Sequence, residues 1–554
     1  MTSVVNYAYD KNVISKIKDW NYGINWPSVY IIYNAHRAYV GETLDAVRRT
    51  EQHLQEPEFD EFTNICLISN KTFNKSVILD LESFLIKYMG SEGSKELTNG
   101  NAGVVNHNYF YKEAYEDDFK DIWQTLTNIG IVKKSLLDVE NSEMFKYSPY
   151  KTLNYEQQNA TYEILKRLYK INSATKESMI QVIGGAGTGK TILAVYIVKL
   201  LADINRNKKV WTSIEDEEIS DLIRHLVIKM NGIRKIGFVV PMSELRETMK
   251  KIFKSIDGLS ADMVLAPEEV VKEYYDVLVV DEAHRLYQRH HLPGQHMYAK
   301  FDRINRQLMS ENFKGDVSDY TELDWIIKSS RIQIIFYDEL QTIRATDIDR
   351  TRFKEICRPH LFAYYTLLSQ MRCKGGNGYY DYVKAILEQE NLTIRDYKKI
   401  SNYQVKVMDS LDELFELIRQ KNLQEGLCNV VCGPGWGLEE DIIIENQVLH
   451  WATGKEEKTD SKTVLSIHKS QGFDLNYAGV IFGKEIYYDK DKKRIEVNKR
   501  ELKDNFTKSG GDEQMRQYLL NIYLTLMTRG INGTYVYAVD ENLREYLMDY
   551  LNQS

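Results

Sequence analysis

The stretch GGAGTGKT, residues 184–191, decides the fold of this chain, because it lies between the apolar run MIQVI (179–183) and the helical pattern ILAVYIVKLL (192–201). A GxxxxGK[ST] loop between a strand and a helix presents backbone N–H groups to phosphates. Lys190 is expected to reach the β- and γ-phosphates, and the Thr191 hydroxyl is expected to ligate Mg²⁺. We therefore predict an ATP site formed by Gly184, Gly185, Ala186, Gly187, Thr188, Gly189, Lys190 and Thr191.

An acidic pair follows about 90 residues later, in YDVLVVDEA (275–283). A hydrophobic strand that ends in two carboxylates can place one on the water shell of a metal ion and the other on the attacking water. Asp281 is expected to hold the metal ion through its water shell, and Glu282 is expected to polarise the attacking water. Together the two motifs predict ATP hydrolysis rather than binding alone.

The sequence around these motifs alternates buried β-runs with helical stretches. The first series is SMIQVIGG (178–185), IGFVVP (236–241), YDVLVVDEA and IQIIFYDE (332–339). A second series is FAYYTLLSQ (362–370), NVVCG (429–433), TVLSIHKSQG (463–472), YAGVIFG (477–483) and TYVYAVD (534–540). Apolar, β-branched strands that alternate with helices predict parallel sheets. We expect two α/β lobes with an ATP site between them.

The N-terminal part has a different pattern. Short strands are predicted at VYIIYN (29–34) and AYVGET (38–43), and helices at DAVRRTEQHL (45–54) and SVILDLESFLIKYM (76–89). A polar, aromatic stretch then leads into a helical connector. The predicted division is a small α/β module at 1–105, a connector at 106–150, a first lobe at 151–350 and a second lobe at 351–554.

Composition limits the class of protein. The 554 residues, of which 43% are hydrophobic and 27% charged, indicate several globular domains. Five cysteines without a CxxC spacing support neither a disulfide framework nor a zinc ribbon, and a cytoplasmic location is expected. The sequence has no secretory signal pattern and no run of about 18 apolar residues, so a membrane protein is not expected. The net charge of −8 decides neither for nor against nucleic acid.

Further landmarks resemble the motif set of superfamily 1 helicases. LNYEQQNA, VVPMSEL, FYDELQTIR, LSQMRCKGG, LSIHKSQGFDLNYAGVIFG and YLTLMTRGINGTYVYAVD follow one another in the order of that family. The resemblance implies an adenine-reading role for Gln157 and a γ-phosphate-sensing role for Asp338 and Gln341. It implies a nucleotide-binding motif at His468, Gln471 and Gly472, and arginine fingers at Arg372 and Arg529. The combination most resembles a bacterial helicase-domain family akin to the helicase module of Schlafen proteins, from about residue 150 to the C-terminus.

Two details of this resemblance affect the expected activity. Cations from a second lobe stabilise charge on the γ-phosphoryl group, and arginine fingers contribute about 10³ to 10⁵ in rate in other NTPases. Tyr337 stands where many helicases have glycine before the aspartate of the third motif. Nucleotide sensing is therefore expected more firmly than strand separation.

The N-terminal module resembles the GIY-YIG nuclease family. Residues 28–30 (SVY) take the place of GIY and residues 39–41 (YVG) that of YIG, so both tyrosines are kept and the first glycine is not. The resemblance implies catalytic roles for Tyr30, Tyr39, Arg49 and His53, and a metal-ligating role for Glu82. Either Asn99 or Asn101 matches the terminal asparagine of the family, and the sequence does not choose between them.

In this nuclease-like reading, Mg²⁺ on Glu82 relieves charge on the leaving group, with Mn²⁺ as an alternative ion. Arg49 holds the phosphate, and Tyr30 is the favoured general base, with Tyr39 assisting through water. A free tyrosine has a pKa of about 10, so the base role requires a nearby cation. A module that binds without cutting is the alternative.

We therefore expect an ATP-dependent nucleic-acid enzyme in which a helicase-like ATPase is coupled to a metal-dependent endonuclease. DNA is favoured over RNA, and anti-phage defence is the setting suggested by analogy. The alternatives are a nucleotide-gated nuclease switch without translocation and an RNA-cleaving enzyme. Oligomer formation and accessory defence proteins are compatible with the sequence.

Overall fold

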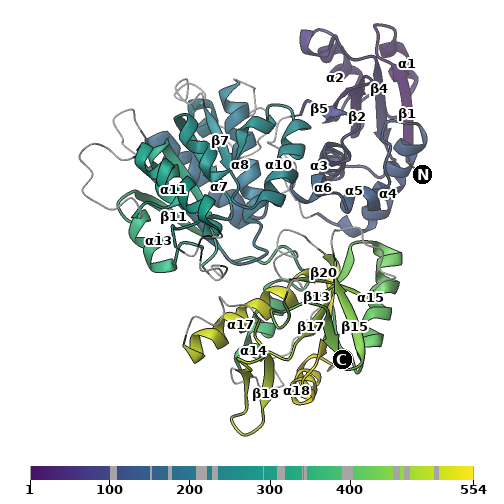
Figure 1. The fold of residues 1–554 in the computed structure, drawn as a ribbon. Helices are drawn as coiled ribbons and strands as arrows, with labels where there is room; N and C mark the ends of the chain where they lie inside the picture. The colour runs from purple at the N-terminus through teal and green to yellow at the C-terminus, as the bar shows by residue number, and fades with distance from the viewer. Residues whose placement is uncertain are drawn as a thin grey trace.

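The computed structural model describes residues 2–99, 109–149, 153–171, 178–206, 221–226, 235–290, 292, 294–308, 319–339, 341, 346–389, 403–437, 440–452, 462–466, 475–503 and 511–552. These residues form three α/β bodies around a helical connector (Figure 1). We call the bodies the N-terminal module (2–99), lobe 1 (153–367) and lobe 2 (376–552), and the connector spans 109–149. None of the described helices is both long and apolar enough to cross a membrane.

The N-terminal module is a mixed sheet with helices on both faces. Its elements are β1 (Ser3–Ala8), α1 (Val13–Asp19), β2 (Ser28–Tyr33), β3 (Arg37–Thr43), α2 (Ala46–His53), β4 (Asn64–Ser69), α3 (Lys75–Glu92) and β5 (Glu96–Leu97). The order is β1-β4-β2-β3-β5, and only β5 runs parallel to its neighbour. Because side chains alternate along a strand, Val29 and Ile31 pack toward α3, whereas Tyr30 and Ile32 share a core with α1 and α2.

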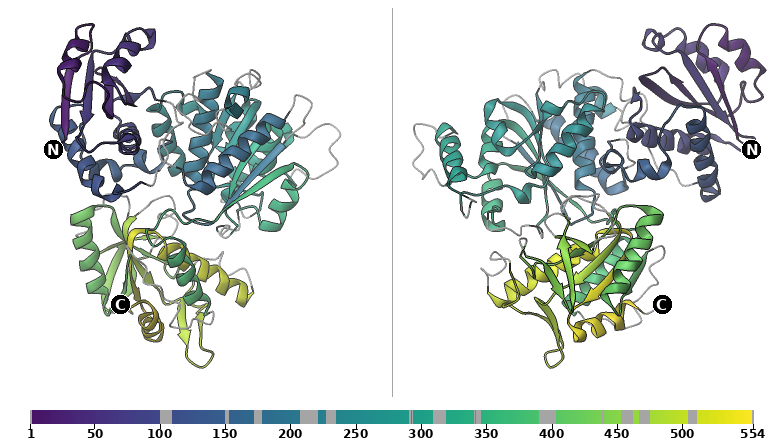
Figure 2. Two further views of the ribbon diagram at one scale, coloured as in Figure 1. Left: turned by 180° about the vertical axis from the view of Figure 1, so that it is seen from behind. Right: turned by 45° about the vertical axis from the view of Figure 1, so that its right-hand side comes forward.

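The connector is helical, as the sequence predicts, and consists of α4 (Tyr115–Asn128), α5 (Leu136–Glu140) and α6 (Glu143–Lys146). Serine side chains begin the two short helices: Ser135 accepts a hydrogen bond from the Asp138 N–H, and Ser142 accepts one from the Phe145 N–H. Both views in Figure 2 place this segment where the three bodies meet.

Lobe 1 is a parallel sheet with helices on both faces. Its elements are α7 (Tyr155–Lys170), β6 (Ser178–Gly184), α8 (Lys190–Asn205), β7 (Ile236–Val239), α10 (Ser243–Lys254), β8 (Val264–Leu265), β9 (Tyr275–Val280), α11 (Gln295–Leu308), α12 (Glu322–Lys328), β10 (Ser330–Tyr337), α13 (Arg350–Cys357) and β11 (Leu361–Leu367). The strand order is β11-β6-β10-β9-β7-β8, and every described pairing is parallel. This is the RecA-like arrangement expected of an ATPase lobe.

One strand was predicted in the wrong sheet. FAYYTLLSQ was expected to open the second lobe, but β11 pairs with β6 at the edge of the lobe 1 sheet. The reason is that α13 buries Phe353 in the lobe 1 core and returns the chain beside β6. The boundary between the two sheets therefore falls after Leu367 rather than at residue 350.

Lobe 2 has a second, larger sheet. Its elements are α14 (Gly376–Glu388), β12 (Gln404–Val407), α15 (Leu411–Glu425), β13 (Cys428–Cys432), β14 (Ile442–Ile444), β15 (Gln447–Trp451), β16 (Thr463–Ser466), β17 (Leu475–Phe482), β18 (Ile486–Asp489), β19 (Arg494–Val497), α17 (Asp512–Met527), β20 (Gly530–Ala538) and α18 (Glu541–Leu551). The order is β12-β20-β17-β13-β16-β15-β14, in which only β14 is antiparallel. β18 and β19 form a separate hairpin.

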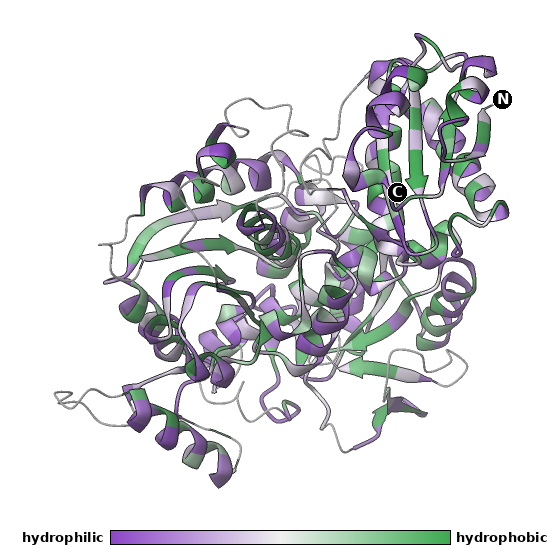
Figure 3. Ribbon diagram, turned by 90° about the horizontal axis from the view of Figure 1, so that it is seen from above, coloured by the Kyte–Doolittle hydropathy of each residue, from purple (hydrophilic) through white to green (hydrophobic). Residues whose placement is uncertain are grey.

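The apolar cores divide the molecule unevenly. One continuous cluster runs from Val29 in the N-terminal module through Trp123 in the connector to Ile334 in lobe 1. The cores on the two faces of the lobe 2 sheet are separate from it. Strands of the N-terminal module are mostly green in Figure 3, whereas its helices alternate green with purple, as expected for helices that cover a sheet.

Candidate active sites

The phosphate-binding loop joins the end of β6 to the start of α8. Gly187 and Gly189 have φ angles of 80° and 77°, which glycine adopts without strain. A Cβ atom on Gly189 would come within 2.5 Å of the Gln157 amide nitrogen. The backbone of the predicted phosphate loop therefore requires glycine at both positions.

Lys190 lies at the centre of a buried polar network. Its ammonium donates to the carbonyl oxygens of Gly184 at 2.8 Å and Gly185 at 2.7 Å, and to Asp338 Oδ2 at 3.1 Å. The same Asp338 oxygen accepts a hydrogen bond from Gln341 Nε2 at 2.9 Å. The network joins the phosphate loop directly to Asp338 and Gln341, the residues predicted to sense the γ-phosphate.

Asp281 and Glu282 have opposite electrostatic environments. Burial, followed by the charge of Glu282, raises the pKa of Asp281 to about 7, and Thr191 and Lys190 partly oppose this. Burial also disfavours charge on Glu282, but His284 and Lys190 outweigh it and hold the pKa of Glu282 well below its usual range. His284 Nε2 lies 2.9 Å from the Glu282 carboxylate. Glu282 is therefore kept ionised, as a residue that orients water must be.

The surroundings of Asp281 fit a bound cation. Its side chain is fully buried, and neither carboxylate oxygen has a hydrogen-bond partner among the described residues. A buried carboxylate keeps its charge only when it is paired or bound to a metal ion. Asp281 and the Thr191 hydroxyl, which lies close enough to influence its pKa, are the groups that would hold Mg²⁺.

Gln157 is fully buried at the start of α7, with both ends of its amide bound to backbone. Its oxygen accepts a hydrogen bond from the Asn154 N–H at 3.1 Å, and its nitrogen donates to the Gly189 carbonyl at 3.2 Å. In this conformation the amide supports the phosphate loop, and a role in reading adenine stays a prediction.

A cavity of about 270 Å³ brings the predicted ATPase residues together from both lobes. The predicted residues that line it are Ala186, Gly187, Gly189, Lys190, Thr191, Glu282, Gln341, Arg372 and Arg529. Arg529 follows the end of α17 and is 2% exposed. His468, Gln471 and Gly472 lie outside the described residues.

The segment between β11 and α14, which joins the two lobes, also reaches this cavity. Gln370 Nε2 donates to the Ala186 carbonyl at 2.8 Å, and the backbone N–H of Met371 donates to the Gly187 carbonyl at 2.8 Å. Arg372 follows directly, so its place beside the loop is fixed by backbone contacts. The sequence did not single out Gln370; its adjacency to the predicted arginine finger was the available signal.

Tyr337, which replaces the glycine common in helicases, is a packing residue in this structure. Its ring stacks on Phe353, with centroids 4.1 Å apart, and lies edge-on to His284 at 6.3 Å. Tyr337 therefore packs the end of β10, next to Asp338, against Phe353 of α13 and against His284, which pairs with Glu282.

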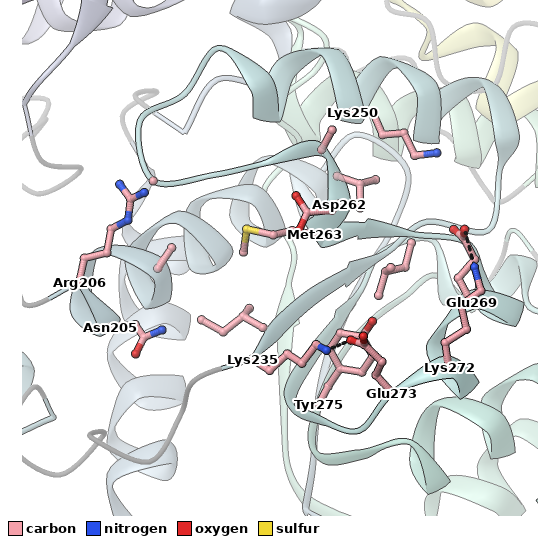
Figure 4. Close-up of a pocket in the computed structure, with 16 residues that line it drawn as sticks. Asn205, Arg206, Lys235, Lys250, Asp262, Met263, Glu269, Lys272, Glu273 and Tyr275 are labelled. Carbon is pink, nitrogen blue, oxygen red and sulfur yellow. Dashed lines mark hydrogen bonds and ion pairs between the residues drawn. The ribbon is translucent and has the colours of Figure 1, made fainter.

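A cavity of about 820 Å³ lies at the opposite edge of the lobe 1 sheet, where β7 and β9 begin (Figure 4). Its lining mixes polar and apolar side chains, and two of its cations are paired with carboxylates: Lys235 with Glu273, and Lys272 with Glu269 at 3.4 Å. Ligands of parallel α/β sheets bind at the carboxyl ends of strands, which face the other way. We assign no part of the ATP site to this cavity.

The N-terminal module gathers its predicted residues around β3. The antiparallel register places Gly41 opposite Tyr30, and a Cβ atom on Gly41 would come within 2.3 Å of the Tyr30 hydroxyl. Tyr30 therefore lies across Gly41, and its ring centroid is 6.2 Å from that of Tyr39. Arg49 Nε donates to the Tyr30 hydroxyl at 3.2 Å.

A hydrogen-bonded chain continues from Tyr30 through His53 to Glu56. The Tyr30 hydroxyl lies 2.8 Å from His53 Nε2, and His53 Nδ1 lies 2.9 Å from a Glu56 oxygen. Burial lowers the pKa of His53 to about 4, so the ring is neutral at pH 7. A neutral ring beside a carboxylate carries its proton on Nδ1, which leaves Nε2 to accept from Tyr30. Glu56 was missed in the sequence, although it follows His53 by three residues.

The burial and hydrogen bonds of Tyr30 affect whether it could act as a base. Burial raises the pKa of Tyr30 well above its usual value, and Arg49 only partly opposes this. Burial likewise raises the pKa of Tyr39. His53 Nε2 is positioned to accept a hydrogen bond from the Tyr30 hydroxyl, and a role of Tyr30 as the base stays a prediction.

Glu82 projects from α3 toward the same edge of the sheet. Burial, followed by the charge of Glu42, raises the pKa of Glu82 to about 8, whereas Lys75 lowers it. One oxygen of Glu42 is buried without a hydrogen-bond partner among the described residues. Two carboxylates in a partly buried position fit a divalent cation. No group of three or more His, Cys, Asp or Glu side chains in the described parts of the chain could hold a metal ion.

Asn99 completes this edge as a substitute for a β-strand. β5 pairs only with Arg37 and Ala38 of β3. Beyond them, the Asn99 amide accepts from the Val40 N–H at 3.0 Å and donates to the Val40 carbonyl at 2.7 Å. Asn99 thus fixes the strand between Tyr39 and Gly41, and Asn101 lies outside the described residues.

Replacing Gly41 with alanine is expected to destabilise the protein by about 1–3 kcal/mol, because the new methyl group overlaps the Tyr30 hydroxyl. Thermal unfolding of the purified variant measures this. Gly378→Ala is the matched control, since a Cβ atom there has nothing within 4 Å and lies in α14. Equal melting temperatures for both variants would show that Tyr30 does not depend on the space above Gly41.

Comparison with known proteins assigns most of the chain to a family. Residues 177–540 match the family model described as Schlafen group 3, DNA/RNA helicase domain, which is more than half of the chain. Uncharacterized protein YPL245W of Saccharomyces cerevisiae is 25% identical over 459 residues, covering 72% of this chain and 90% of that protein.

Two solved structures also show a likeness. A Bacteroides Pif1 bound to single-stranded DNA is 10% identical, covers 72% of this chain and 94% of its own, and has a TM-score of 0.27. The Pif1 helicase of Candida albicans is 11% identical, covers 70% and 94%, and has the same TM-score of 0.27. Both TM-scores are low, and the family of the chain is shown by the match over residues 177–540.

Proposed function

Because the chain belongs to the Schlafen group 3 DNA/RNA helicase domain family, we propose that it couples a superfamily 1 helicase-type ATPase to a metal-dependent endonuclease of the GIY-YIG type. The ATPase part of the proposal is supported by one cavity that Lys190 and Glu282 of lobe 1 line together with Arg529 of lobe 2. DNA is the proposed substrate, and anti-phage defence is the proposed setting by analogy.

In the proposed ATPase reaction each lobe supplies different chemistry. Mg²⁺, held by Thr191 and Asp281, would neutralise charge on the β- and γ-phosphates. Lys190 exchanges its carbonyl partners for phosphate oxygens, and the ionised Glu282 orients and polarises the attacking water. Arg372 and Arg529 stabilise the charge that develops on the γ-phosphoryl group.

The test of this function is whether nucleic acid stimulates ATP hydrolysis. Single-stranded DNA, duplex DNA and RNA of one sequence are compared at fixed salt, because binding to the phosphate backbone depends on salt concentration. Single-stranded DNA is expected to stimulate most. Stimulation by RNA alone would favour the RNA-cleaving alternative, and no stimulation by any of the three would contradict a helicase-type motor.

Arg529→Ala is expected to retain nucleotide binding and lose turnover by about 10³-fold or more, since an arginine finger acts mainly in the transition state. ATP affinity by fluorescence titration and steady-state turnover separate these two effects. Arg544→Ala serves as a control, because Arg544 lies on α18 and does not line the nucleotide cavity. Weaker ATP affinity with unchanged turnover would instead make Arg529 a binding residue.

For the nuclease part, the support is the cluster of Tyr30, Arg49 and His53 beside Glu82. We assign Arg49 to neutralisation of the phosphate and Tyr30, which is hydrogen-bonded to both Arg49 and His53, to activation of the nucleophile. A divalent ion on Glu82, Mg²⁺ or Mn²⁺, would relieve charge on the leaving oxygen.

Binding of Mg²⁺ to the N-terminal module is expected to strengthen with pH. Below about pH 8, Glu82 holds a proton that the ion must displace. The Glu82-dependent affinity should rise roughly tenfold per pH unit below that pKa and level off above it. Calorimetric Mg²⁺ titrations without nucleotide measure this, with Glu82→Gln as the variant that cannot titrate. A flat profile in the wild type would exclude Glu82 as the ligand.

A second candidate function is a nucleotide-gated nuclease switch without translocation. It is favoured by the connector, which reaches the ATP cavity from the N-terminal module. A slowly hydrolysed ATP analogue should support strand cleavage if occupancy alone gates the nuclease. The analogue should fail if translocation is required.

A further inference from the structure

The connector contacts all three bodies within a few residues. On the N-terminal module, Glu140 accepts a hydrogen bond from the Tyr88 hydroxyl at 2.6 Å. The ring of Phe145 packs on Tyr88, with centroids 5.0 Å apart, and the Lys87 ammonium lies 4.8 Å above Phe145. Tyr88 and Lys87 belong to α3, the helix that carries Glu82.

The same segment is fixed to both lobes. The Ser255 hydroxyl, next to α10 of lobe 1, lies 3.8 Å from Met144 Sδ. On the lobe 2 side, the Asn141 amide donates to the Glu425 carbonyl at 3.0 Å and accepts from Asn476 at 2.9 Å. The connector therefore bridges the two lobes through neighbouring residues of α5 and α6.

The connector also forms part of the nucleotide cavity itself. Its residues Glu140, Phe145, Lys146 and Tyr147 line the cavity that contains Lys190 and Arg529. Lys146 is a cation on the last turn of α6, and a nucleoside triphosphate concentrates negative charge in the same space. Phe145 is thus shared between the cavity wall and the aromatic contact with α3.

We propose that the connector is the third wall of the nucleotide site, where Lys146 contacts the bound triphosphate and Phe145 links occupancy of the site to α3. This proposal rests on the ATPase assignment above. It deepens that assignment by naming the route by which a nucleoside triphosphate acts on the N-terminal module.

The binding part is tested with Lys146→Ala. Loss of one charge-assisted contact is expected to raise the Kd of a fluorescent, slowly hydrolysed ATP analogue about tenfold. Lys120→Ala is the matched control, because Lys120 lies on α4 of the same connector, 60% exposed, and pairs with Asp117. A Kd for Lys146→Ala equal to that of Lys120→Ala would overturn the proposal.

The coupling part is tested by hydrogen exchange of the α3 amides in the full chain. In the wild type the analogue is expected to slow exchange around Leu85–Met89 by at least about threefold. Phe145→Leu keeps an apolar side chain but removes the ring contact, and it should abolish this response when the analogue is present at a saturating concentration. An unchanged response in Phe145→Leu would overturn the route through α3.

Lys190→Ala separates the two levels of inference. If it leaves analogue affinity unchanged, the ATP site itself is wrongly assigned. If Lys190→Ala loses binding while Lys146→Ala matches its control, the ATPase assignment stands and the third wall fails. Because neither readout requires strand cleavage, both results hold whether or not the N-terminal module cuts nucleic acid.

Discussion

Lys190→Ala is expected to reduce ATP hydrolysis by at least about 10³-fold. The ammonium already bonds to the Gly184 and Gly185 carbonyls and to Asp338, so it is held where the β- and γ-phosphates would replace the carbonyls. Alanine removes the cation and also leaves Asp338 with one partner fewer.

The measurement is phosphate release at saturating single-stranded DNA, with circular dichroism to confirm folding. Lys250→Ala is the matched control, since Lys250 lies on α10 and pairs only with Glu247 at 3.1 Å among its described ion pairs. Wild-type turnover by purified Lys190→Ala would show that the phosphate loop has been assigned to the wrong reaction.

Glu82→Ala and Arg49→Ala are each expected to reduce metal-dependent strand cleavage by about 10³-fold while ATP hydrolysis persists. Neither side chain lines the nucleotide cavity, which is why the ATPase should survive. The two losses have different causes. Without Glu82 the cation loses a carboxylate ligand, whereas without Arg49 the phosphate is no longer positioned or neutralised.

Neighbouring residues on α2 provide controls of matched charge for both variants. Arg48→Ala and Glu51→Ala remove the same charges from exposed positions on one helix. Cleavage of a labelled duplex is followed in parallel with ATP turnover in the same preparation. Unimpaired cutting by the Glu82→Ala, Arg49→Ala double variant, free of contaminating nuclease, would remove the N-terminal module from the chemistry.

The strands that support the ATP site could be predicted because their information is local. The runs predicted for β6, β9 and β10 coincide closely with the observed bounds, since a buried parallel strand must be apolar on both faces. The glycines before Lys190 likewise mark a loop whose conformation requires them.

Features that depend on long-range partners could not be predicted. Nothing in the β-run of β11 indicates which sheet it joins, because that depends on where α13 packs. From the sequence, Phe145 and Lys146 are predicted only to belong to a helical connector. Their contribution to the cavity follows from contacts among three bodies far apart in the sequence.

The continuous core that joins the N-terminal module, the connector and lobe 1 should determine how the protein unfolds when it is heated. Residues that share one apolar cluster lose their packing together, so these three parts should melt in a single cooperative transition. Lobe 2 keeps its own cores and can melt in a transition of its own. A chain shortened to begin at residue 153 would uncover apolar surface on lobe 1 and should aggregate, whereas the intact chain should stay in solution.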